Sequence, residues 1–518
     1  MAKRLKIVLL VSAAALLAGV LVLWLWMRSH STDDHLRLVP KDAAAVLRID
    51  IGQLALKADP AKLMEQPAFK NSKNKWPALL SDPFSSGIDP LENIYGFLAK
   101  KDNGVALALV FNVDDDEKLA AFAKNAGFGE AVKLDDHYQI ATNTGFCIAW
   151  NDEAGIMLYT SGINAVEAAA AYLRQDKNNS VTQNDAYNEF AAKKNDLGLF
   201  INNKQLALVS GSAGSLSPLG ISDGYGEVAV NFENDKIAAV YSNRPEKATI
   251  APVIRTNGQA ESQFSAVAPQ TPVAYAGLAL DMNLLLAMLN NDPAMQQNLA
   301  MAEMATDLSD KEIKTLFTGD MQIAVTDYRD ISQFDPRIQA QERKMKAADP
   351  ETTDEDFALF VPMTYISLGE TDDEKFNTIF TGLGMTRMNN AWVIPGIDFI
   401  VYASAKNGHL LITNDFYAAD SLGASGMLKG KLPGSFSKKT PLLGWVNLEQ
   451  SQLPASIIQP APASDLSGIF PDALPWLQPF SSLELKGQIN HTELDLLVKP
   501  GEGNSLFRLL SAYASLAR

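Results

Sequence analysis

Two short acidic runs, each followed by a lysine, are the residues of this chain with the most obvious capacity for chemistry. One run spans Val113 to Leu119 (VDDDEKL) and the other spans Thr371 to Phe376 (TDDEKF). Clustered carboxylates can hold a hard metal ion or take part in general acid–base catalysis. A calcium loop, however, spaces its ligands at alternate positions around a central glycine, and neither run does so.

The same two runs fit the start of a helix. Each has the spacing of a capping box, in which the first side chain accepts from a backbone N–H and a glutamate reaches back. Apolar residues then recur at helical spacing, and Gly127 and Gly384 suit the two helix ends. We therefore predict helix caps at both runs rather than metal or catalytic sites. The predicted capping pairs are Asp114 with Glu117 and Thr371 with Glu374.

No familiar catalytic or nucleotide-binding motif accompanies these runs, since H-E-x-x-H, the Walker loop, G-x-G-x-x-G and G-x-S-x-G are all absent from the sequence. The single cysteine, Cys147, lies in the apolar run GFCIAW, which favours a small core residue. His137 and His409 lie beside strands in different halves, where a structural role is more typical. Ser435 to Lys438 matches S-x-x-K, but the companion motifs of penicillin-recognising enzymes are missing. We predict no catalytic residue, no cofactor site and no metal site.

The charge balance argues against nucleic acid as a partner. The formal net charge of the 518 residues is −16. The first 31 residues contain four basic residues and no acid, which leaves 40 basic and 60 acidic groups for the remainder. A protein with this excess of acidic groups repels the phosphate groups of nucleic acids. The sequence contains no cluster of basic residues interleaved with aromatic residues that would offset the repulsion.

An uncharged apolar run, Ile7 to Met27, indicates a membrane anchor. As a helix it would be about 30 Å long, which is the thickness of a bilayer's hydrocarbon core. Three basic residues precede it and two aspartates follow it, so the positive-inside rule places the amino terminus in the cytoplasm. A cleaved signal peptide is the alternative, but the run ends in WLWM rather than at a small-residue cleavage site.

We predict that residues 1–31 are a cytoplasmic N-terminus and a transmembrane signal anchor. The protein would then cross a membrane once, with its C-terminal domains outside the cytoplasm. Whether the anchor is ever cleaved stays open.

Landmarks of the remaining chain recur about 250 residues apart, which indicates tandem duplication rather than a short-period repeat. The predicted fold class is α+β: an N-terminal transmembrane helix followed by two tandem duplicated domains, each an antiparallel sheet with packed helices. The predicted boundaries are 35–245 for the first repeat, 246–263 for a linker and 264–511 for the second repeat.

The two predicted repeats differ most at one place. In the first, the tight turn Lys100 to Gly104 joins two strands. In the second, a charged insertion, 327–356, takes the place of that turn. Asp335 and Pro336 are of the types preferred at an N-cap and at the first helical position, so we predict a helix.

Two interpretations of this insertion stay open: a solvated surface loop, which costs little, and an arm that contacts a protein partner or an anionic surface. The candidate contact residues are Arg337, Ile338, Arg343, Lys344, Met345 and Lys346.

Four short stretches resemble the bacterial envelope family known as domain-of-unknown-function family 4836. They are Val39 to Ala43 (VPKDA), Asp82 to Asp89 (DPFSSGID), the DDDEKL segment and the CIAWND strand. The resemblance implies an envelope protein and supplies no activity or catalytic residue. Members typically look like lipoproteins, whereas Leu16 to Val20 (LLAGV) has valine where the lipid-bearing cysteine belongs.

We interpret the chain as a membrane-anchored extracytoplasmic protein of unknown activity that binds or scaffolds, without catalysis, in the bacterial envelope. Its predicted partners are the membrane, through the N-terminal helix, and an envelope protein. The alternative is a hydrolase that acts on an envelope polymer. A pocket with paired carboxylates about 5 to 10 Å apart would favour the hydrolase, and a broad apolar patch would favour binding. The sequence does not identify a ligand, a partner or an oligomeric state.

Overall fold

The computed structural model describes most of the chain after residue 33. The described residues are 34–66, 83–101, 104–134, 136–141, 145–210, 224–244, 269–289, 296, 304, 308–309, 312, 315–333, 335–349, 351–394, 401–425, 440–458, 475–488 and 490–516. The predicted membrane span, 7–27, and the predicted linker, 246–263, lie outside these residues. None of the described helices combines the length and the apolar character that a membrane crossing requires.

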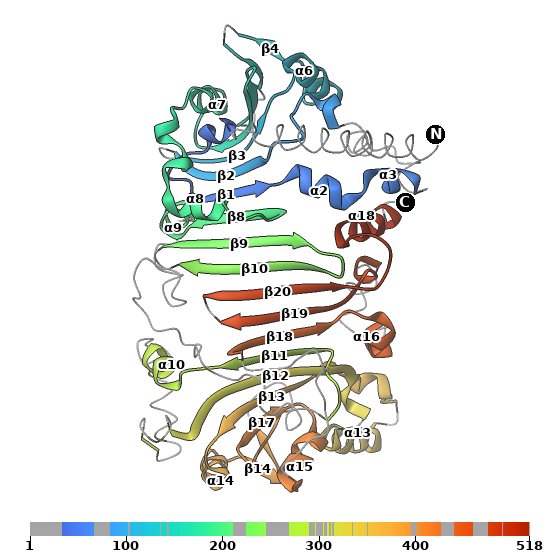
Figure 1. The fold of residues 1–518 in the computed structure, drawn as a ribbon. Coiled ribbons are helices and arrows are strands. Elements are labelled where there is room, and N and C mark those ends of the chain that lie inside the picture. The colour runs from blue at the N-terminus through green and yellow to red at the C-terminus, as the bar shows by residue number, and fades with distance from the viewer. Residues whose placement is uncertain are drawn as a thin grey trace, which may run out of the picture. The chain divides into compact units, whose positions relative to one another are not determined.

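The chain divides into two compact units, residues 1–213 and 214–518. The described residues form twenty strands, and every pairing among them is antiparallel (Figure 1). The fold class predicted from the sequence, two α+β domains behind a transmembrane helix, is therefore wrong. Long antiparallel pairing dominates both units. The helices are short and lie between or beside strands.

The first unit has eight strands in the order β8-β1-β2-β3-β7-β6-β5-β4. The strands are β1 (Ala45–Ile49), β2 (Ile94–Lys101), β3 (Gly104–Asn112), β4 (Val132–Lys133), β5 (Tyr138–Ala141), β6 (Phe146–Trp150), β7 (Ala154–Ser161) and β8 (Leu197–Asn202). The helices are η1 (Asp34–Leu38), α2 (Ile51–Ala58), α3 (Pro60–Glu65), η2 (Pro83–Ser86), α6 (Asp116–Asn125), α7 (Ala165–Leu173), η3 (Lys177–Asn179), η4 (Val181–Gln183), α8 (Asp185–Ala191) and α9 (Asn203–Ser210).

The second unit has twelve strands in the order β9-β10-β20-β19-β18-β11-β12-β13-β17-β16-β15-β14. The strands are β9 (Tyr225–Phe232), β10 (Lys236–Arg244), β11 (Ala274–Ala279), β12 (Phe317–Asp330), β13 (Phe360–Glu370), β14 (Thr386–Met388), β15 (Ala391–Ile394), β16 (Val401–Lys406), β17 (His409–Thr413), β18 (Leu442–Asn447), β19 (Phe480–Gln488) and β20 (His491–Val498). The helices are α10 (Met282–Leu289), η7 (Ile331–Gln333), α13 (Pro336–Ala348), η8 (Asp354–Phe357), α14 (Asp373–Gly382), α15 (Phe416–Ser425), η9 (Gln450–Gln452), α16 (Ala455–Ile458) and α18 (Ser505–Leu516).

The same succession of eight strands occurs in both units. In the second unit, β18, β11, β12, β13, β17, β16, β15 and β14 neighbour one another as β8, β1, β2, β3, β7, β6, β5 and β4 do in the first. In both, a strand in the middle of this series runs directly into a capped helix: β3 into α6 and β13 into α14. These two joints supply a common frame for comparing side chains.

The helices α6 and α14 end as their sequences predict. Gly127 and Gly384 follow them with φ angles of +89° and +69°, the left-handed conformation that glycine adopts without strain. The next residues, Phe128 and Met385, donate back to carbonyls five residues earlier. The apolar residues that follow the caps pack inward, as expected: Leu119 and Ala123 from α6, and Phe376 and Phe380 from α14.

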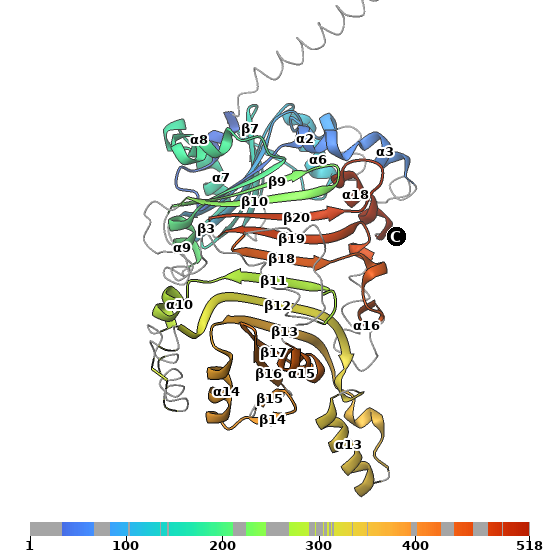
Figure 2. The ribbon, with the colours of Figure 1, turned by 60° about the horizontal axis from the view of Figure 1, so that its bottom comes forward.

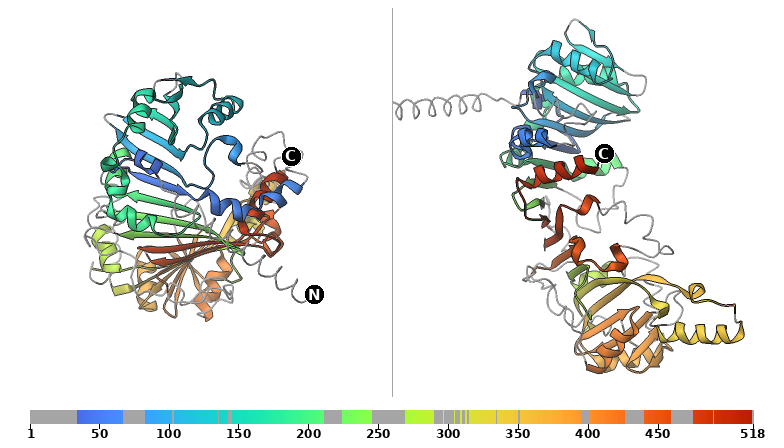
Figure 3. Two further views of the ribbon diagram at one scale, coloured as in Figure 1. Left: turned by 45° about the horizontal axis from the view of Figure 1, so that its top comes forward. Right: turned by 90° about the vertical axis from the view of Figure 1, so that its right-hand side faces the viewer.

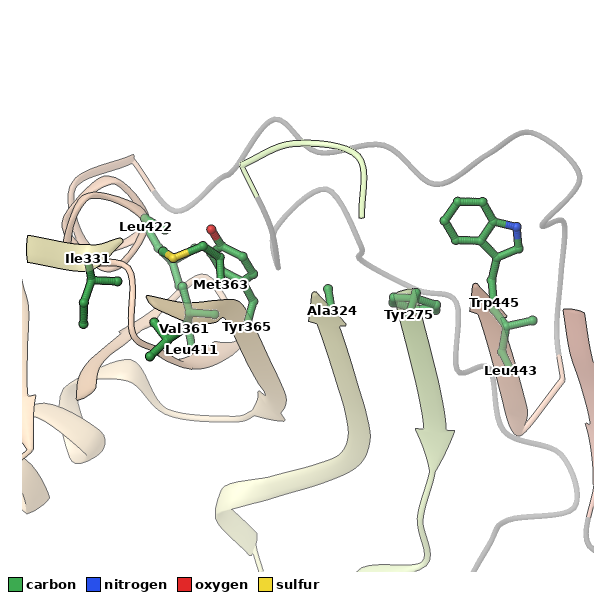
Figure 4. Packing of buried hydrophobic residues seen from close by; sticks show 11 residues of the cluster. Tyr275, Ala324, Ile331, Val361, Met363, Tyr365, Leu411, Leu422, Leu443 and Trp445 are labelled. Carbon is green, nitrogen blue, oxygen red and sulfur yellow. The ribbon is translucent and has the colours of Figure 1, made fainter. Parts of the chain in front are cut away.

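The two faces of the second unit's sheet are covered differently. On one face α14 packs its phenylalanines against Leu410 and Trp392. On the other, a row of buried side chains crosses successive strands from Trp445 through Tyr275 and Ala324 to Tyr365 (Figure 4). Leu422 of α15 and Ile331 of η7 belong to the same row of packing. This second face leads directly to the polar site described next.

Candidate functional site

A polar pocket of about 170 Å³ lies where β12, β13 and β17 meet in the second unit. Its lining comes from three separate segments of the sequence, and the lining residues that the structure describes include no lysine or arginine. The lining residues are Thr318, Asp320, Gln322, Ser367, Gly369, Glu370, Gly408 and His409. Four of them are polar and buried: Gln322, Ser367, Glu370 and His409.

An irregularity in β12 makes room for this pocket. Phe317 and Met321 are four residues apart but pair with residues only two apart in β13, so this part of β12 bulges. Gly319, in the bulge, has a φ of +90°, and a Cβ there would lie 2.1 Å from a backbone oxygen. Gly369 faces the bulge, and a Cβ there would lie 2.1 Å from the Oγ1 of Thr318. Bulges redirect side chains, and here the bulge requires glycine at position 319 and leaves little room for a side chain at position 369.

Strand alternation places three buried polar side chains on one face. Ser367 lies opposite Gln322 across β12 and β13, and His409 lies opposite Gly369 across β13 and β17. The Oγ of Ser367 and the Nδ1 of His409 are 3.4 Å apart. Gln322 is 4% exposed, and its Oε1 has no hydrogen-bond partner in the part of the chain that the structure describes. Burial lowers the pKa of His409, so its imidazole is neutral at pH 7.

Glu370 separates the pocket from helix α14. It is 3% exposed, and its Oε2 accepts from the backbone N–H of Asp372 at 2.5 Å. Burial, together with a hydrogen bond to Asp373, raises the pKa of the Glu370 carboxyl to about 7. The same hydrogen bond lowers the pKa of Asp373, which also accepts from the N–H groups of Asn407 and Gly408. Glu370 is therefore the acid that carries the proton of this pair below about pH 7.

A second candidate surface is the arm formed by the insertion 327–356. Its predicted helix is confirmed as α13, and the buried cap Asp335 accepts from the N–H groups of Arg337 and Ile338. The Oδ2 of Asp335 also accepts from the hydroxyl of Tyr402 at 2.6 Å. Ile338 packs against the apolar row of Figure 4. The root of the arm is thus a fixed part of the second unit's core.

Beyond this root, α13 extends away from the strands of the second unit (Figures 2 and 3). Arg343, Lys344 and Met345 lie on its outer half and are exposed, Met345 to 46%. Within the described residues, ion pairs to Glu342 and Asp354 hold Lys346, whereas neither neighbouring base has one. The outer half of the arm therefore presents two exposed bases beside an exposed thioether.

The six predicted contact residues separate into two groups. Ile338 belongs to the packed root, and Lys346 is engaged in ion pairs within the arm. The other four are exposed: Arg337, Arg343, Lys344 and Met345. The arm and the polar pocket are distinct sites, since no residue belongs to both.

The predicted helix caps are wrong by one residue. Helices α6 and α14 are capped by Asp115 and Asp372, in place of Asp114 and Thr371. Each cap carboxylate accepts from the N–H three residues later, at 2.9 Å. The Thr371 hydroxyl donates instead to the carbonyl of Thr315, a tertiary contact that a local pattern cannot reveal. Several adjacent acids at each joint also made the local choice ambiguous.

The other chemistry-bearing residues lie apart from both sites. Cys147 is buried as expected, and burial raises the pKa of its thiol to about 11, which makes it unreactive. The Nδ1 of His137 is 2.6 Å from a carboxylate oxygen of Asp136. The Ser435–Lys438 segment lies outside the described residues. In the ranges that the structure describes, no three His, Cys, Asp or Glu side chains come together as a metal site would require.

The sequence analysis named none of the polar pocket residues except His409, and a signal existed for two of them, Gln322 and Ser367. Gln322 is two residues from Ala324 in β12, and Ser367 is two residues from Tyr365 in β13. Ala324 and Tyr365 are buried in the apolar cluster on the same face, so a polar residue at position 322 or 367 breaks the apolar pattern of that face. A polar residue at a core position normally requires a partner. No local pattern, however, shows that positions 322, 367 and 409 meet.

Comparison with known proteins places the chain in a family without giving it an activity. No curated protein matches it. It is similar to crystal forms III, I and IV of TP0453, with identities of 10%, 11% and 8% and TM-scores of 0.28, 0.26 and 0.27. These matches cover 42%, 43% and 40% of this chain and 82%, 82% and 80% of that one. A similarity this low carries no conclusion about function.

The family model described as "Domain of unknown function (DUF4836)" matches residues 36–426, about three quarters of the chain. The match confirms the resemblance seen in the four short stretches of the sequence. It covers residues 36–213 of the first unit, the polar pocket and the arm. This chain belongs to the DUF4836 family.

Proposed function

We propose that this protein is anchored in the bacterial inner membrane by residues 7–27 and that its periplasmic part binds a protein partner through the outer half of α13. The observation that carries the proposal is the order of the arm. A surface helix whose capping aspartate is buried in the core, and whose outer half exposes adjacent bases and a methionine, fits a built contact surface better than a tolerated loop.

The arm is not needed to connect its two strands. In the first unit, the corresponding strands β2 and β3 are joined by the short segment from Lys101 to Gly104. Ordering thirteen helical residues costs conformational entropy that contacts made by the helix must offset. The root of the arm makes such contacts within the second unit. The outer half is more exposed, so we infer that contacts with a partner offset the rest of the entropy cost.

Charge supports the choice of partner. The chain carries a net charge of −16, yet positions 343 and 344 are both basic and exposed. A positive tip favours encounter with an acidic surface. Met345 beside the bases adds a flexible apolar contact of the kind that adaptable interfaces use.

The membrane topology rests on the sequence alone, and a fusion experiment tests it. A periplasm-active reporter fused after Arg518 is expected to be active, because the basic residues flank only the amino-terminal side of the apolar run. A reporter that works only in the cytoplasm, fused at the same position, is expected to be silent. The opposite pair of results would reverse the topology and remove the envelope assignment.

The partner contact is tested by changing the tip and leaving the root intact. We expect Arg343→Ser/Lys344→Ser/Met345→Ser in the full-length chain to lose crosslinking and co-purification of the partner from native membranes. The melting temperature should hardly change, because exposed substitutions typically alter stability by less than about 0.5 kcal/mol.

The matched control is Lys193→Ser/Lys194→Ser, which removes two adjacent exposed bases from the first unit. This control should keep the partner. Unchanged co-purification with the tip variant would move the contact elsewhere. If the control lost the partner to the same extent, the effect of the tip variant would be explained by the change in overall charge.

The rival interpretation, a hydrolase of an envelope polymer, gains no support from the pocket. A space of about 170 Å³ is smaller than the few hundred Å³ that drug-sized ligands occupy, so it leaves little room for a segment of polymer.

A further inference from the structure

The polar pocket is not a requirement of the fold. Three of its four buried polar side chains, Gln322, Ser367 and His409, have counterparts in the first unit, defined by the shared strand order and by the distance to the helix cap. Ser367 and its counterpart each precede the capping aspartate by five residues. The counterparts of Gln322, Ser367 and His409 are all buried, and they are Tyr95, Val110 and Ala154.

Among the described residues, the buried Oε1 of Gln322 has no hydrogen-bond donor. Leaving a buried acceptor unpaired costs about 1 to 3 kcal/mol, and native proteins seldom do so without a reason. The amide lines the pocket, so a molecule in the pocket that donates a hydrogen bond would satisfy it.

The pocket lining is rich in acceptors and contains no cation among the described residues. Asp320 and Glu370 contribute carboxyl groups, Gln322 an amide oxygen, and Ser367 and Thr318 hydroxyls. His409 is neutral and adds no positive charge at pH 7. The complementary ligand therefore carries several N–H donors and a positive charge, and an anion is excluded by like-charge repulsion.

The size of the pocket limits the ligand further. A protein cavity of about 150 Å³ accommodates benzene, with its six carbon atoms. A space of about 170 Å³ is thus filled by a ligand of about that size. A bare metal ion fits less well, since its carboxylate and imidazole ligands would have to converge, and no such convergence occurs in the described part of the chain.

We propose that this pocket binds a small primary ammonium ion. Its N–H groups would donate to the Oε1 of Gln322 and to the carboxyl oxygens of Asp320 and Glu370, and its short alkyl chain would fill the remaining space. This proposal is independent of the arm and of any partner bound there, since the two sites share no residue.

Calorimetric titration of the full-length chain with n-butylammonium chloride tests the proposal. We expect saturable binding of one ion per chain. Two matched probes separate charge from hydrogen bonding. Tetramethylammonium has the charge but no N–H donor, and 1-butanol has the alkyl chain but no charge. Neither should bind.

Two variants locate the site. Gln322→Tyr places in the pocket the side chain that the first unit has at the corresponding position, and it should abolish binding. Glu370→Gln retains an acceptor for the Asp372 N–H and a donor for Asp373, so it should fold while weakening binding about tenfold. The arm-tip variant is the control and should bind n-butylammonium normally.

Several results would overturn the proposal. Equal heat from tetramethylammonium would mean general attraction to an acidic chain, and binding of 1-butanol alone would mean an apolar pocket. Unchanged affinity in Gln322→Tyr would place the amine elsewhere. If Gln322→Tyr fails to fold, Ser367→Val replaces it as the test. This variant introduces the residue that the first unit has at the corresponding position, Val110, and unchanged amine affinity in it would also place the amine elsewhere.

Discussion

The turn from a central strand into a helix is built twice in this protein, and the two versions differ at the residue before it. In the first unit, Val113 stands two residues before the capping Asp115 and packs into the apolar cluster beneath α6. In the second, Glu370 stands two residues before Asp372 and accepts from the backbone N–H of that cap. The helices that follow have the same length, ten residues each.

The difference shows that the joint does not depend on a buried acid. An apolar residue gives the same cap, the same helix and the same terminal glycine. The glutamate adds a titratable group whose pKa lies near neutrality and a polar wall for the adjacent pocket. In the first unit the corresponding space is closed by Tyr95, whose ring lies 5.4 Å from that of His35 in η1. Packed side chains fill the space beside this turn in the first unit, whereas a polar pocket with a titratable carboxyl lies beside it in the second.

Exchanging the residue that closes the space gives the largest expected effect. Tyr95→Gln copies the second unit's residue into the first unit and removes a fully buried ring, so we expect a loss of about 4 kcal/mol in the free energy of unfolding. The reciprocal change, Gln322→Tyr, should alter stability by less than about 1.5 kcal/mol because the pocket offers space. Denaturant unfolding of both variants measures the contrast. Equal losses of unfolding free energy in the two variants would show that the pocket is packed as rigidly as the core around Tyr95.

The buried acid gives the next effect, and it depends on pH. The folded-state pKa of Glu370 is about 7 instead of 4.5, so between these values the folded chain retains a proton that the unfolded chain has released. The free energy of unfolding therefore falls as the pH rises from 4.5 to about 7, by roughly 2 kcal/mol from this group.

Glu370→Gln should abolish that fall, because the amide keeps both hydrogen bonds without a charge. The charged neighbours are Asp372 and Asp373, and the pKa of Asp373 is lowered by its hydrogen bond to Glu370, so Asp373 stays ionised over this range. His409 acts in the opposite direction below pH 6.5, because burial favours its neutral form. The measurement is the difference in unfolding free energy between Glu370→Gln and the parent at each pH. A difference that is independent of pH would contradict the raised pKa.

Changing the caps gives the smallest effect, and it should be similar in the two units. Asp372→Ala should cost about 1 kcal/mol, as is typical for a lost N-cap. Asp115→Ala should destabilise the first unit in the same direction. Asp114→Ala, one residue earlier, should have little effect, because Asp114 is not the cap. Thermal unfolding of the three variants is the test, and a larger loss for Asp114→Ala would restore the cap assignment made from the sequence.

Local features were predictable from the sequence, and long-range ones were not. The start of α13 and the glycine ends of α6 and α14 follow from short-range signals, because capping involves residues only a few positions apart. The order of the twenty strands depends on which strands pair, and alternation along a strand does not encode its partner. The pocket is harder still to predict, because Gln322, Ser367 and His409 come together only once the order of the strands is known.

The pairing of β10 with β20 has a consequence for how the chain comes to be folded. Lys236 of β10 forms an ion pair with Asp495 of β20, 259 residues later in the chain. At the usual speed of ribosomes, about 5 to 20 residues per second, roughly 10 to 50 s pass between synthesis of the two strands. During that interval one edge of the β9–β10 hairpin has no strand beside it, and open edges are where chains aggregate. Synthesis of this protein thus has a vulnerable period that ends only when its last strands emerge.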